Sequence, residues 1–431
     1  MSKSASGSTR RAFLKNAMGA AIAAPWVVPA SAFGRSGSMS PSDRINAAAI
    51  GTRNRGNDLI RGVIRHPDVR LLLVCDVDKK IREQRMGECN KSYAEQERGQ
   101  NITQAIHDYR EIMDRTDMDV VLIATPDHWH AVLAIAALRS GKDVYCEKPM
   151  TLTIAEGRAM ADAVARYARV FQCGSQRRSE ERPRRACEAV RNGRIGKLLR
   201  VEVGIGLRPV KPEPDIAEPV PPELDYDLWL GPAPWAPYST KRCHYNFRFV
   251  RDYSGGEMTN FGAHFFDVAQ WGIGADDGGP VEIEGKGEFF DGLHNTFSKV
   301  DVTYQYANGV ILHGSHSAGG CKFVGTDGWV DAERLVGEPK QAILEPLGPN
   351  DVHLFVPKGG HMGNFIEAVR TRGRTAATVE IGHRSASVCH LGNIAMTLER
   401  RLKWDPVAEQ FLGDDEANRL RLRPYREPYT L

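Results

Sequence analysis

Short apolar runs alternate with longer amphipathic stretches over residues 44–175. The apolar runs INAAAIG, VRLLLVCD, DVVLIATP, DVYCEKP and VFQCG have the length and the Val, Ile and Leu content of buried strands. Stretches of helix length, each apolar on one face, separate these runs. Strands that alternate with helices in this way predict a parallel sheet covered by helices on both faces. We therefore predict a doubly wound α/β domain at 44–175.

The pattern changes after residue 175. An amphipathic helix, RPRRACEAVRNG, precedes a strand at LLRVEVGIGL, and a Pro-rich stretch follows at 208–237. Beyond a helix predicted at 257–273, strands with alternating apolar and polar residues dominate, and the Asn-Gly pair in YANGV predicts a hairpin. Helices return near 360–372 and 384–402. We predict a second, α+β domain at 176–431 with a large, open, mainly antiparallel sheet.

The first 43 residues do not fit either pattern. The stretch STRRAFLK carries paired arginines, a weakly apolar run broken by two prolines follows, and ASA at 30–32 fits a cleavage site. We predict a twin-arginine export signal at 1–32 and a polar Gly/Ser linker at 33–43. The alternative is a disordered tail with a chance arginine pair. The signal predicts a periplasmic protein that the twin-arginine export machinery carries across the membrane already folded.

Charge and cysteine content narrow the possible partners. The chain has 57 basic and 54 acidic residues, and four of the basic ones lie in the predicted signal. The remainder is close to neutral, so we predict no binding to nucleic acid and no association with a membrane once the signal is removed. Eight scattered cysteines without a C-x-x-C pair predict free, mostly buried thiols.

The turn AAIGTRNRG carries part of a dinucleotide-binding pattern. Gly51 ends the first strand and Gly56 opens the helix, as do the first and last glycines of G-x-G-x-x-G, but Arg53 stands at the middle position. Asn54 tolerates a positive φ. Asp76 ends the second strand, where an acid binds the adenosine ribose of NAD. The order predicts a Rossmann-type domain for NAD, and Arg53 keeps NADP open; the alternative is an ordinary tight turn with a strand-end aspartate.

The stretch CEKPM places a lysine at the edge of the predicted parallel sheet where ligands bind. Glu147 and Lys148 follow the strand, and Pro149 stops it. A lysine there can hydrogen-bond a substrate oxygen and stabilise the negative charge that develops on it. The alternative is an exposed lysine at a strand end.

Three polar residues share one face of the helix predicted at 257–273. Asn260, His264 and Asp267 stand at positions i, i+4 and i+7. His264 could take a proton from a substrate hydroxyl, because a histidine titrates near neutral pH. The alternative is a buried structural histidine held by Asp267. In DHWH, two histidines lack a third ligand nearby, so we predict no metal.

These residues resemble the family of glucose–fructose oxidoreductase, inositol dehydrogenase and MocA. The resemblance covers essentially the whole chain after the signal and rests on DVVLIATPDHWHA, CEKPM, VRNGRIGKLLRVEV, DYSGGEMTNFGAHFFDVAQW, GTDGW and WDP. It implies that Lys148 is the catalytic lysine, that His264 is the general acid/base and that the DHWH loop lies beside the nicotinamide. Asn260 departs from the family, because many members have an aspartate there.

The predicted site residues fall into three groups. Lys148, His264 and Asn260 are predicted to be catalytic. The predicted substrate-binding residues are Lys148, Asn260, His264 and Tyr245. The predicted cofactor-binding residues are Gly51, Arg53, Asn54, Arg55, Gly56, Asp76, Thr125, Pro126, His128, His130, Glu147 and Lys148. The aromatic residues Trp229, Trp235, Tyr238 and Tyr245 offer flat faces suited to a pyranose ring, with ordinary loop packing as the alternative.

Together these features predict an NAD(P)-dependent oxidoreductase that acts on a secondary alcohol or ketone of a sugar or cyclitol. Because free NAD(H) is scarce outside the cytoplasmic membrane, export predicts a tightly bound cofactor, and Arg53 could slow its release. Two alternatives stay open: net non-redox glycoside lysis through a transient keto sugar, and a sugar- or cofactor-binding protein whose chemistry has lapsed. The open sheet and the resemblance predict a homodimer or homotetramer.

Overall fold

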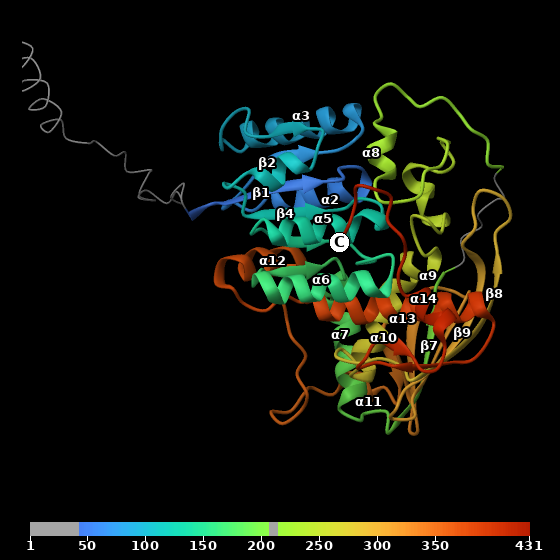
Figure 1. Ribbon diagram of the computed structural model, residues 1–431. Helices are drawn as coiled ribbons and strands as arrows, with labels where there is room; N and C mark the ends of the chain where they lie inside the picture. Colours follow the sequence, from blue (N-terminus) through green and yellow to red (C-terminus); the bar gives the residue numbers. More distant parts are fainter. Residues whose placement is uncertain (1–42, 207–213) are drawn as a thin grey trace, which may run out of the picture. The chain divides into compact units, whose positions relative to one another are not determined.

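The computed structural model describes residues 43–206 and 214–431. The predicted export signal and nearly all of the predicted linker lie outside the described residues. The chain divides into the units Met1–Arg44 and Ile45–Leu431, and the fold below is that of the second unit (Figure 1).

The first half of this unit is built on a six-stranded parallel sheet in the order β3-β2-β1-β4-β5-β6. This confirms the predicted doubly wound fold. The strands are β1 (Ile45–Ile50), β2 (Val69–Cys75), β3 (Gln104–Ile106), β4 (Val120–Ile123), β5 (Asp143–Cys146) and β6 (Phe171–Cys173). Sequence reasoning missed β3, an edge strand of three residues that are only partly covered and that carry no alternating pattern.

Both faces of this sheet are covered. Along β1, Ala47 and Ala49 belong to one apolar core, whereas Ala48 and Ile50 belong to another on the opposite face. Such two-sided burial explains why the strand reads as one continuous apolar run. The helices of this part are α2 (Asn54–Val63), α3 (Lys79–Glu95), α4 (Arg110–Asp114), α5 (Asp127–Arg139) and α6 (Ile154–Tyr167).

The second half contains a nine-stranded mixed sheet in the order β13-β12-β11-β7-β10-β9-β8-β14-β15. Only β7 and β10 pair in parallel among these neighbours, so the sheet is mainly antiparallel as predicted, and β9 and β10 form the predicted hairpin. Its strands are β7 (Leu198–Gly204), β8 (Glu282–Phe289), β9 (Phe297–Gln305), β10 (Ile311–Ser315), β11 (Gly320–Gly325), β12 (Trp329–Asp331), β13 (Val336–Glu338), β14 (Leu402–Asp405) and β15 (Gln410–Phe411).

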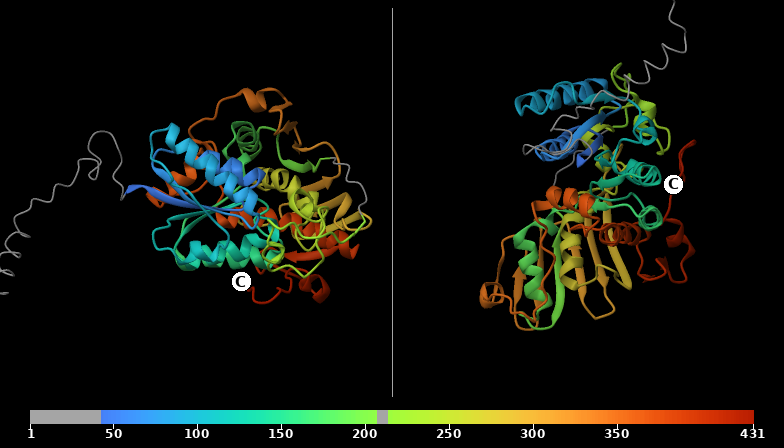
Figure 2. Two further views of the ribbon diagram at one scale, coloured as in Figure 1. Left: turned by 90° about the horizontal axis from the view of Figure 1, so that it is seen from above. Right: turned by 90° about the vertical axis from the view of Figure 1, so that its left-hand side faces the viewer.

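The longer helices α7 (Glu181–Arg191), α10 (Gly262–Ile273) and α13 (Val379–Leu398) contact this sheet from one side (Figures 1 and 2). The helical segments of this half are η3 (Gln176–Ser179), α7 (Glu181–Arg191), α8 (Tyr226–Leu230), η4 (His244–Phe249), α9 (Glu257–Asn260), α10 (Gly262–Ile273), α11 (Gln341–Leu344), α12 (Gly360–Thr371), α13 (Val379–Leu398) and α14 (Asp415–Arg419). Within the described residues, no helix combines the length and the apolar character needed to cross a membrane.

The helix predicted at 257–273 is broken. The structure has two helices, α9 and α10, which meet at Phe261. The carboxylate of Asp267 is buried and accepts hydrogen bonds from Arg178 at 2.8 and 3.0 Å and from Ser385 at 2.6 Å. The hypothesis that Asp267 holds His264 is therefore wrong, because Arg178 and Ser385 take that carboxylate.

Late parts of the chain return to complete the first sheet's two cores. Phe365 and Val369 of α12 join the core on one face, and Val379 and Ile381 of α13 join the core on the other. All eight cysteines are buried and free, as predicted.

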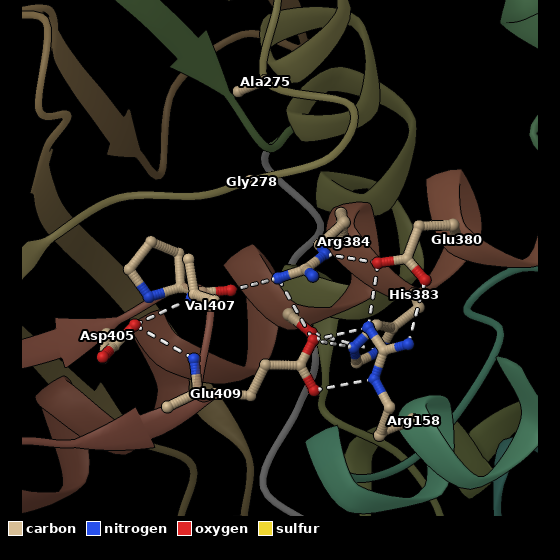
Figure 3. A network of polar contacts seen from close by, with 12 residues as sticks. Arg158, Ala275, Gly278, Glu380, His383, Arg384, Asp405, Val407 and Glu409 are labelled. Atoms are coloured by element: carbon tan, nitrogen blue, oxygen red, sulfur yellow. Dashed lines mark hydrogen bonds and ion pairs between the residues drawn. The ribbon is translucent and has the colours of Figure 1, made fainter. Parts of the chain in front are cut away.

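A network of ion pairs ties α6 to α13 and to the β14–β15 connection (Figure 3). Arg158 of α6 donates to Glu380 at 2.8 Å and to Glu409 at 2.8 Å. His383 donates to the same Glu409 carboxylate at 2.6 Å, and Arg384 also lies against it at 3.1 Å. Met160 and Ala161 of α6 belong to one core of the first sheet, and α13 contacts β8 and β9 of the second sheet, so this network joins the two halves of the unit.

We predict that Glu409→Gln lowers stability in a pH-dependent way. Burial alone would raise the pKa of Glu409, but hydrogen bonds from His383 and Arg158 outweigh burial and hold the pKa well below its usual range. A carboxyl with a depressed folded-state pKa stabilises the fold above the unfolded-state pKa of about 4.3, and this stabilisation is lost as the pH falls below that value. The difference in Tm between wild type and variant should therefore be largest near neutral pH and shrink on acidification.

The control for this measurement is Glu416→Gln, at an exposed carboxylate that pairs with Arg400. We expect no measurable change in Tm, since exposed ion pairs contribute little. A Glu409→Gln difference that stayed constant from neutral to acid pH would contradict the prediction.

Candidate active site

A cavity of about 500 Å³ lies at the carboxyl edge of the first sheet. Asp76, Leu224 and His244 line it near the end of β2, which is called the ribose end below. Lys148 and His264 also line it and lie close to each other. Most of the site residues predicted from the sequence line it. They are Gly51, Arg53, Asn54, Arg55, Asp76, Thr125, Pro126, His130, Glu147, Lys148, Tyr245 and His264.

The turn after β1 needs both of its glycines. Gly51 has φ +79°, and a Cβ atom there would lie 2.7 Å from the carbonyl oxygen of Ala124. A Cβ on Gly56 would collide with the carbonyl oxygen of Gly51. Gly56 does not line the cavity; it lets α2 begin directly behind the turn, where backbone N–H groups at a helix N-terminus can meet a phosphate.

The middle residue of the turn is held at the end of β2. The guanidinium of Arg53 donates to the carboxylate of Asp78 at 2.5 Å. The neighbouring Asp76 accepts from the backbone N–H of Thr52 at 2.8 Å and from that of Asp78 at 3.1 Å. Burial raises the pKa of Asp76, although these hydrogen bonds oppose the shift. The ion pair with Asp78 thus directs the side chain of Arg53 toward the ribose end of the predicted nucleotide site.

Glu147 organises the middle of the cavity. Glu147 is 4% exposed. Its carboxylate accepts hydrogen bonds from Arg55 Nε at 2.8 Å and from Gln176 Nε2 at 3.2 Å. Burial opposes the charge of Arg55, but the Glu147 carboxylate outweighs burial and raises the pKa of Arg55. Sequence reasoning did not find Gln176, because it belongs to a short 3₁₀ turn with no motif of its own.

Lys148 and Asn260 meet across the two halves of the unit. The ammonium of Lys148 donates to the backbone oxygen of Asn260 at 2.7 Å and lies 3.4 Å from the side-chain oxygen of Asn260. Arg248 Nε lies 3.4 Å from that same side-chain oxygen. Burial lowers the pKa of Lys148, although nearby carboxylates, Glu147 first, oppose the shift. Asn260 does not line the cavity itself; it positions the lysine.

His264 lines the same end of the cavity as an uncharged ring. Burial first, and then the positive charges of Lys148, Arg177 and Arg55, lower the pKa of His264 to about 2. Its Nδ1 atom is buried and has no hydrogen-bond partner in the described part of the chain. The ring is therefore neutral and can accept a proton only as a weak base, which differs from the near-neutral titration expected from the sequence.

The DHWH segment splits between the cavity and the interior. His130 lies between two backbone oxygens, with Nδ1 2.8 Å from Pro149 and Nε2 3.0 Å from Thr125. His128 is fully buried, its ring packs against Trp229 and Tyr253, and burial lowers its pKa to about 3. His128 was predicted to contact the cofactor, but it does not line the cavity. Its position on α5 turns the side chain into the interior.

The segment 223–248, which begins inside the Pro-rich stretch and continues beyond it, covers the ribose end of the cavity. Asp225 pairs with His107 at 3.0 Å, and the backbone N–H of Lys79 donates to Glu223 at 2.9 Å. No motif in the sequence predicts these contacts. They bring to the cavity five lining residues that sequence reasoning missed, namely Leu224, Leu228, His244, Phe247 and Arg248.

The four aromatic residues of this segment have different environments. Trp229 and Tyr245 line the cavity. Trp235 is 70% exposed and does not line it, and Tyr238 is buried against Tyr226. Among residues 43–206 and 214–431, no three His, Cys, Asp or Glu side chains gather where they could hold a metal ion.

The residues at the cavity fit a dinucleotide. The glycine turn permits close backbone approach, the N-terminus of α2 begins there, and a carboxylate stands at the end of β2, which together are what the ADP half of NAD requires. The hydroxyl oxygen of Thr125 at the cavity wall is buried and has no partner within the described ranges.

Comparisons with known proteins agree with this geometry. Levoglucosan dehydrogenase of Pseudarthrobacter phenanthrenivorans is 41% identical over 92 residues, which are 21% of this chain and 24% of that protein. A glycosyl hydrolase family 109 protein of Shewanella sp. strain ANA-3 is 32% identical over 166 residues, 35% of this chain and 36% of that protein. The matches thus span well under half the length of these relatives.

A solved structure covers more of the chain. The WlbA dehydrogenase from Bordetella pertussis, in complex with NADH and UDP-GlcNAcA, aligns with a TM-score of 0.62 at 16% identity, over 84% of this chain and 99% of that chain. It shares the fold.

Two sequence models together account for most of the described residues. The model of the oxidoreductase family's NAD-binding Rossmann fold matches residues 45–175, and the model of its C-terminal alpha/beta domain matches residues 211–431. The chain therefore belongs to the Gfo/Idh/MocA oxidoreductase family and carries that family's NAD-binding Rossmann domain.

Proposed function

We propose that the protein is an NAD-dependent oxidoreductase that acts on a CH–OH group of a sugar or cyclitol. The observation that carries this proposal is that Lys148 and His264 line the same cavity as the glycine turn and Asp76. An acid–base pair thus lies where a bound nicotinamide ring and a small alcohol would meet. Bound NAD supplies the acceptor for a hydride from the substrate carbon.

The residues have separate roles in this scheme. Lys148 donates a hydrogen bond to the substrate oxygen, and its lowered pKa makes the ammonium a stronger donor. The neutral ring of His264 accepts the hydroxyl proton, and a weak base suffices because this proton becomes strongly acidic as hydride leaves the same carbon. Asn260 keeps the lysine ammonium in place through the 2.7 Å hydrogen bond to its backbone oxygen, a contact that does not depend on its side chain. The amide in place of aspartate is therefore compatible with catalysis.

The ribose end favours NAD over NADP. Two carboxylates, Asp76 and Asp78, stand at the end of β2, and Arg53 is already paired with one of them. A 2′-phosphate would add negative charge beside Asp76. Arg53, the residue that left NADP as an alternative, is thus already paired with Asp78.

We further propose that the protein is exported through the twin-arginine pathway and acts in the periplasm as a homo-oligomer with a retained cofactor. Free cofactor is scarce there, so each reaction must restore it within the site. The segment at 223–248 supports retention, because it covers the ribose end of the cavity through contacts with the β2–α3 region.

We predict that the full chain, purified from the periplasmic fraction without added cofactor, contains stoichiometric nicotinamide. The measurement is release by acid denaturation followed by quantitation, and then a panel of sugars and cyclitols added to the intact protein while the absorbance of reduced nicotinamide is followed. An empty site in a protein that is active with freely exchanging NAD would contradict retention.

The similarity to glycosyl hydrolase family 109 proteins favours a second candidate, net non-redox lysis of a glycoside. Oxidation of a ring carbon acidifies the neighbouring C–H. Loss of that proton expels the aglycone, which leaves as its protonated alcohol, water adds to the resulting double bond, and the hydride then returns to the ring carbon. This reaction releases the aglycone without a lasting change in absorbance, whereas the oxidoreductase reaction leaves reduced cofactor or a reduced second sugar. A protein that binds cofactor and sugar but does neither would be a lapsed enzyme.

A further inference from the structure

Arg248 is a cation beside the reacting groups of the cavity, and the chemistry proposed above does not use it. It lines the cavity together with Lys148 and His264. Its Nε atom lies 3.4 Å from the side-chain oxygen of Asn260, the residue whose backbone oxygen holds Lys148. The phosphates of a dinucleotide belong at the glycine turn. Arg248 therefore faces the place where the substrate reacts.

The guanidinium of Arg248 is held by aromatic rings and by the backbone. It lies 4.6 Å from the centre of the Tyr245 ring and 4.6 Å from the centre of the Phe247 ring. Its Nη1 atom donates a hydrogen bond to the backbone oxygen of Tyr245 at 3.0 Å. Contacts of this kind orient a guanidinium without cancelling its charge, and they leave other N–H groups of the fork for a ligand.

Arg248 differs from the other arginines at the cavity wall in its lack of an ion pair. Arg53 pairs with Asp78, and Arg55 pairs with Glu147. Within the described ranges, no carboxylate lies at ion-pair distance from Arg248, whose polar contacts are the two oxygens named above. The protein thus orients this guanidinium but does not neutralise it.

The carboxylates nearby do not offset this charge. Those that act on Lys148 most strongly are Glu147, Asp127 and Glu257. Glu147 is engaged by Arg55 at 2.8 Å. Glu257 does not line the cavity, and it accepts a hydrogen bond from the side chain of Asn260 at 3.2 Å. Asp127 is then the carboxylate that remains for both cations.

Asp127 can offset only part of the charge. It lines the cavity and accepts a hydrogen bond from the hydroxyl of Ser254 at 2.5 Å. Even when it is fully ionised, Asp127 supplies one negative charge against the positive charges of Lys148 and Arg248, which line the same cavity. Lys148 serves the oxygen that reacts. The charge of Arg248 is therefore left for a different group of the substrate.

A carboxylate or a phosphate is the group that fits Arg248. The planar fork of a guanidinium binds both through two parallel, charge-assisted hydrogen bonds, and a neutral hydroxyl would leave its charge unbalanced. We propose that Arg248 determines substrate specificity and that the substrate is an anionic sugar, with its acidic group at Arg248 and its reacting carbinol at Lys148. This inference rests on the function proposed above and names the substrate class of the same site.

The test compares sugars that differ only at C6. The full chain is loaded with NADH, so that a ring hydroxyl binds but cannot be oxidised, and each sugar is supplied as its methyl glycoside. Calorimetry gives dissociation constants for the glucoside, the glucuronide and the glucoside 6-phosphate, and for the same set built on galactose and mannose. We expect an anion to bind about 10- to 100-fold more tightly than its neutral parent, the usual effect of a charge-assisted hydrogen bond. The tighter of the two anions distinguishes a sugar acid from a sugar phosphate.

Variants of Arg248 connect this preference to the guanidinium. Arg248→Gln should lower the affinity for the anion to that of the neutral parent and leave the affinity for the neutral parent unchanged. Arg248→Lys keeps the charge without the fork and should retain part of the preference. Arg251→Gln is the matched control, because Arg251 follows shortly in the chain but does not line this cavity, and it should bind like wild type. The NADH content of each variant shows that it is folded.

Two results would overturn the inference. One is that no anion binds more tightly than its neutral parent. The other is that the preference for an anion persists in Arg248→Gln. Failure of the proposed function would look different: the preference would depend on Arg248, but the same sugars added to the NAD-loaded protein would transfer no hydride.

Discussion

Replacing Lys148 with alanine is expected to reduce turnover by about 10²- to 10³-fold, the usual effect of removing one donor that stabilises a developing oxyanion. The ammonium of Lys148 is held by the backbone oxygen of Asn260 at 2.7 Å and borders the cavity that also contains His264. This loss of turnover should appear in kcat, measured at saturating concentrations of sugar. The cofactor content of the purified variant should stay at the wild-type level, because the glycine turn and Asp76 are untouched.

The matched control is Lys142→Ala. Lys142 is also buried, and its ammonium donates to the backbone oxygens of Met113 and Ser140 at 3.1 and 3.2 Å, but it does not line the cavity. This variant should lower stability and leave the kcat of the folded protein unchanged. Unaltered turnover in Lys148→Ala would refute the assignment of Lys148, and equal losses in both variants would show that folding, not chemistry, was measured.

The first sheet and most of the cavity could be predicted because two properties of parallel sheets are visible in the sequence. Strands buried on both faces read as continuous apolar runs, and their carboxyl ends all meet at one edge. Gly51, Asp76 and Lys148 each follow such a run, so three separated motifs were expected to converge, and they do. The local pattern alone carried this information.

Other features depend on contacts that a linear pattern does not contain. The break at Phe261 separates Asn260 from the helix of His264, and helical periodicity does not show it. His264 and Asp267 do share α10, but the partners of Asp267 are Arg178 and Ser385, which lie far away in the sequence. The apolar faces of α12 and α13 are evident in the sequence, but which core they complete is not. Arg248 reaches the cavity from a segment without any motif.

The buried pair Arg178–Asp267 should make Asp267→Asn strongly destabilising. Arg178 and Asp267 have side chains only 2% and 1% exposed, and the guanidinium Nε donates to both carboxylate oxygens. Removing one charge leaves the other buried with only Asp276 to balance it. We expect a loss of about 3–5 kcal/mol in the free energy of unfolding, the range for breaking a buried ion pair from one side. Denaturant titration followed by tryptophan fluorescence measures it.

Asp414→Asn provides the comparison with an exposed pair. Asp414 pairs with Arg400 at 2.9 Å on the surface, and an asparagine keeps the cap of α14, so we expect no measurable loss of stability. The decisive second readout is catalytic. Because Asp267 contacts Arg178 and Ser385 and not His264, the folded fraction of Asp267→Asn should keep the wild-type pH profile of kcat. A shifted profile with unchanged stability would mean that Asp267 acts on the histidine after all, and that the buried pair contributes little to the fold.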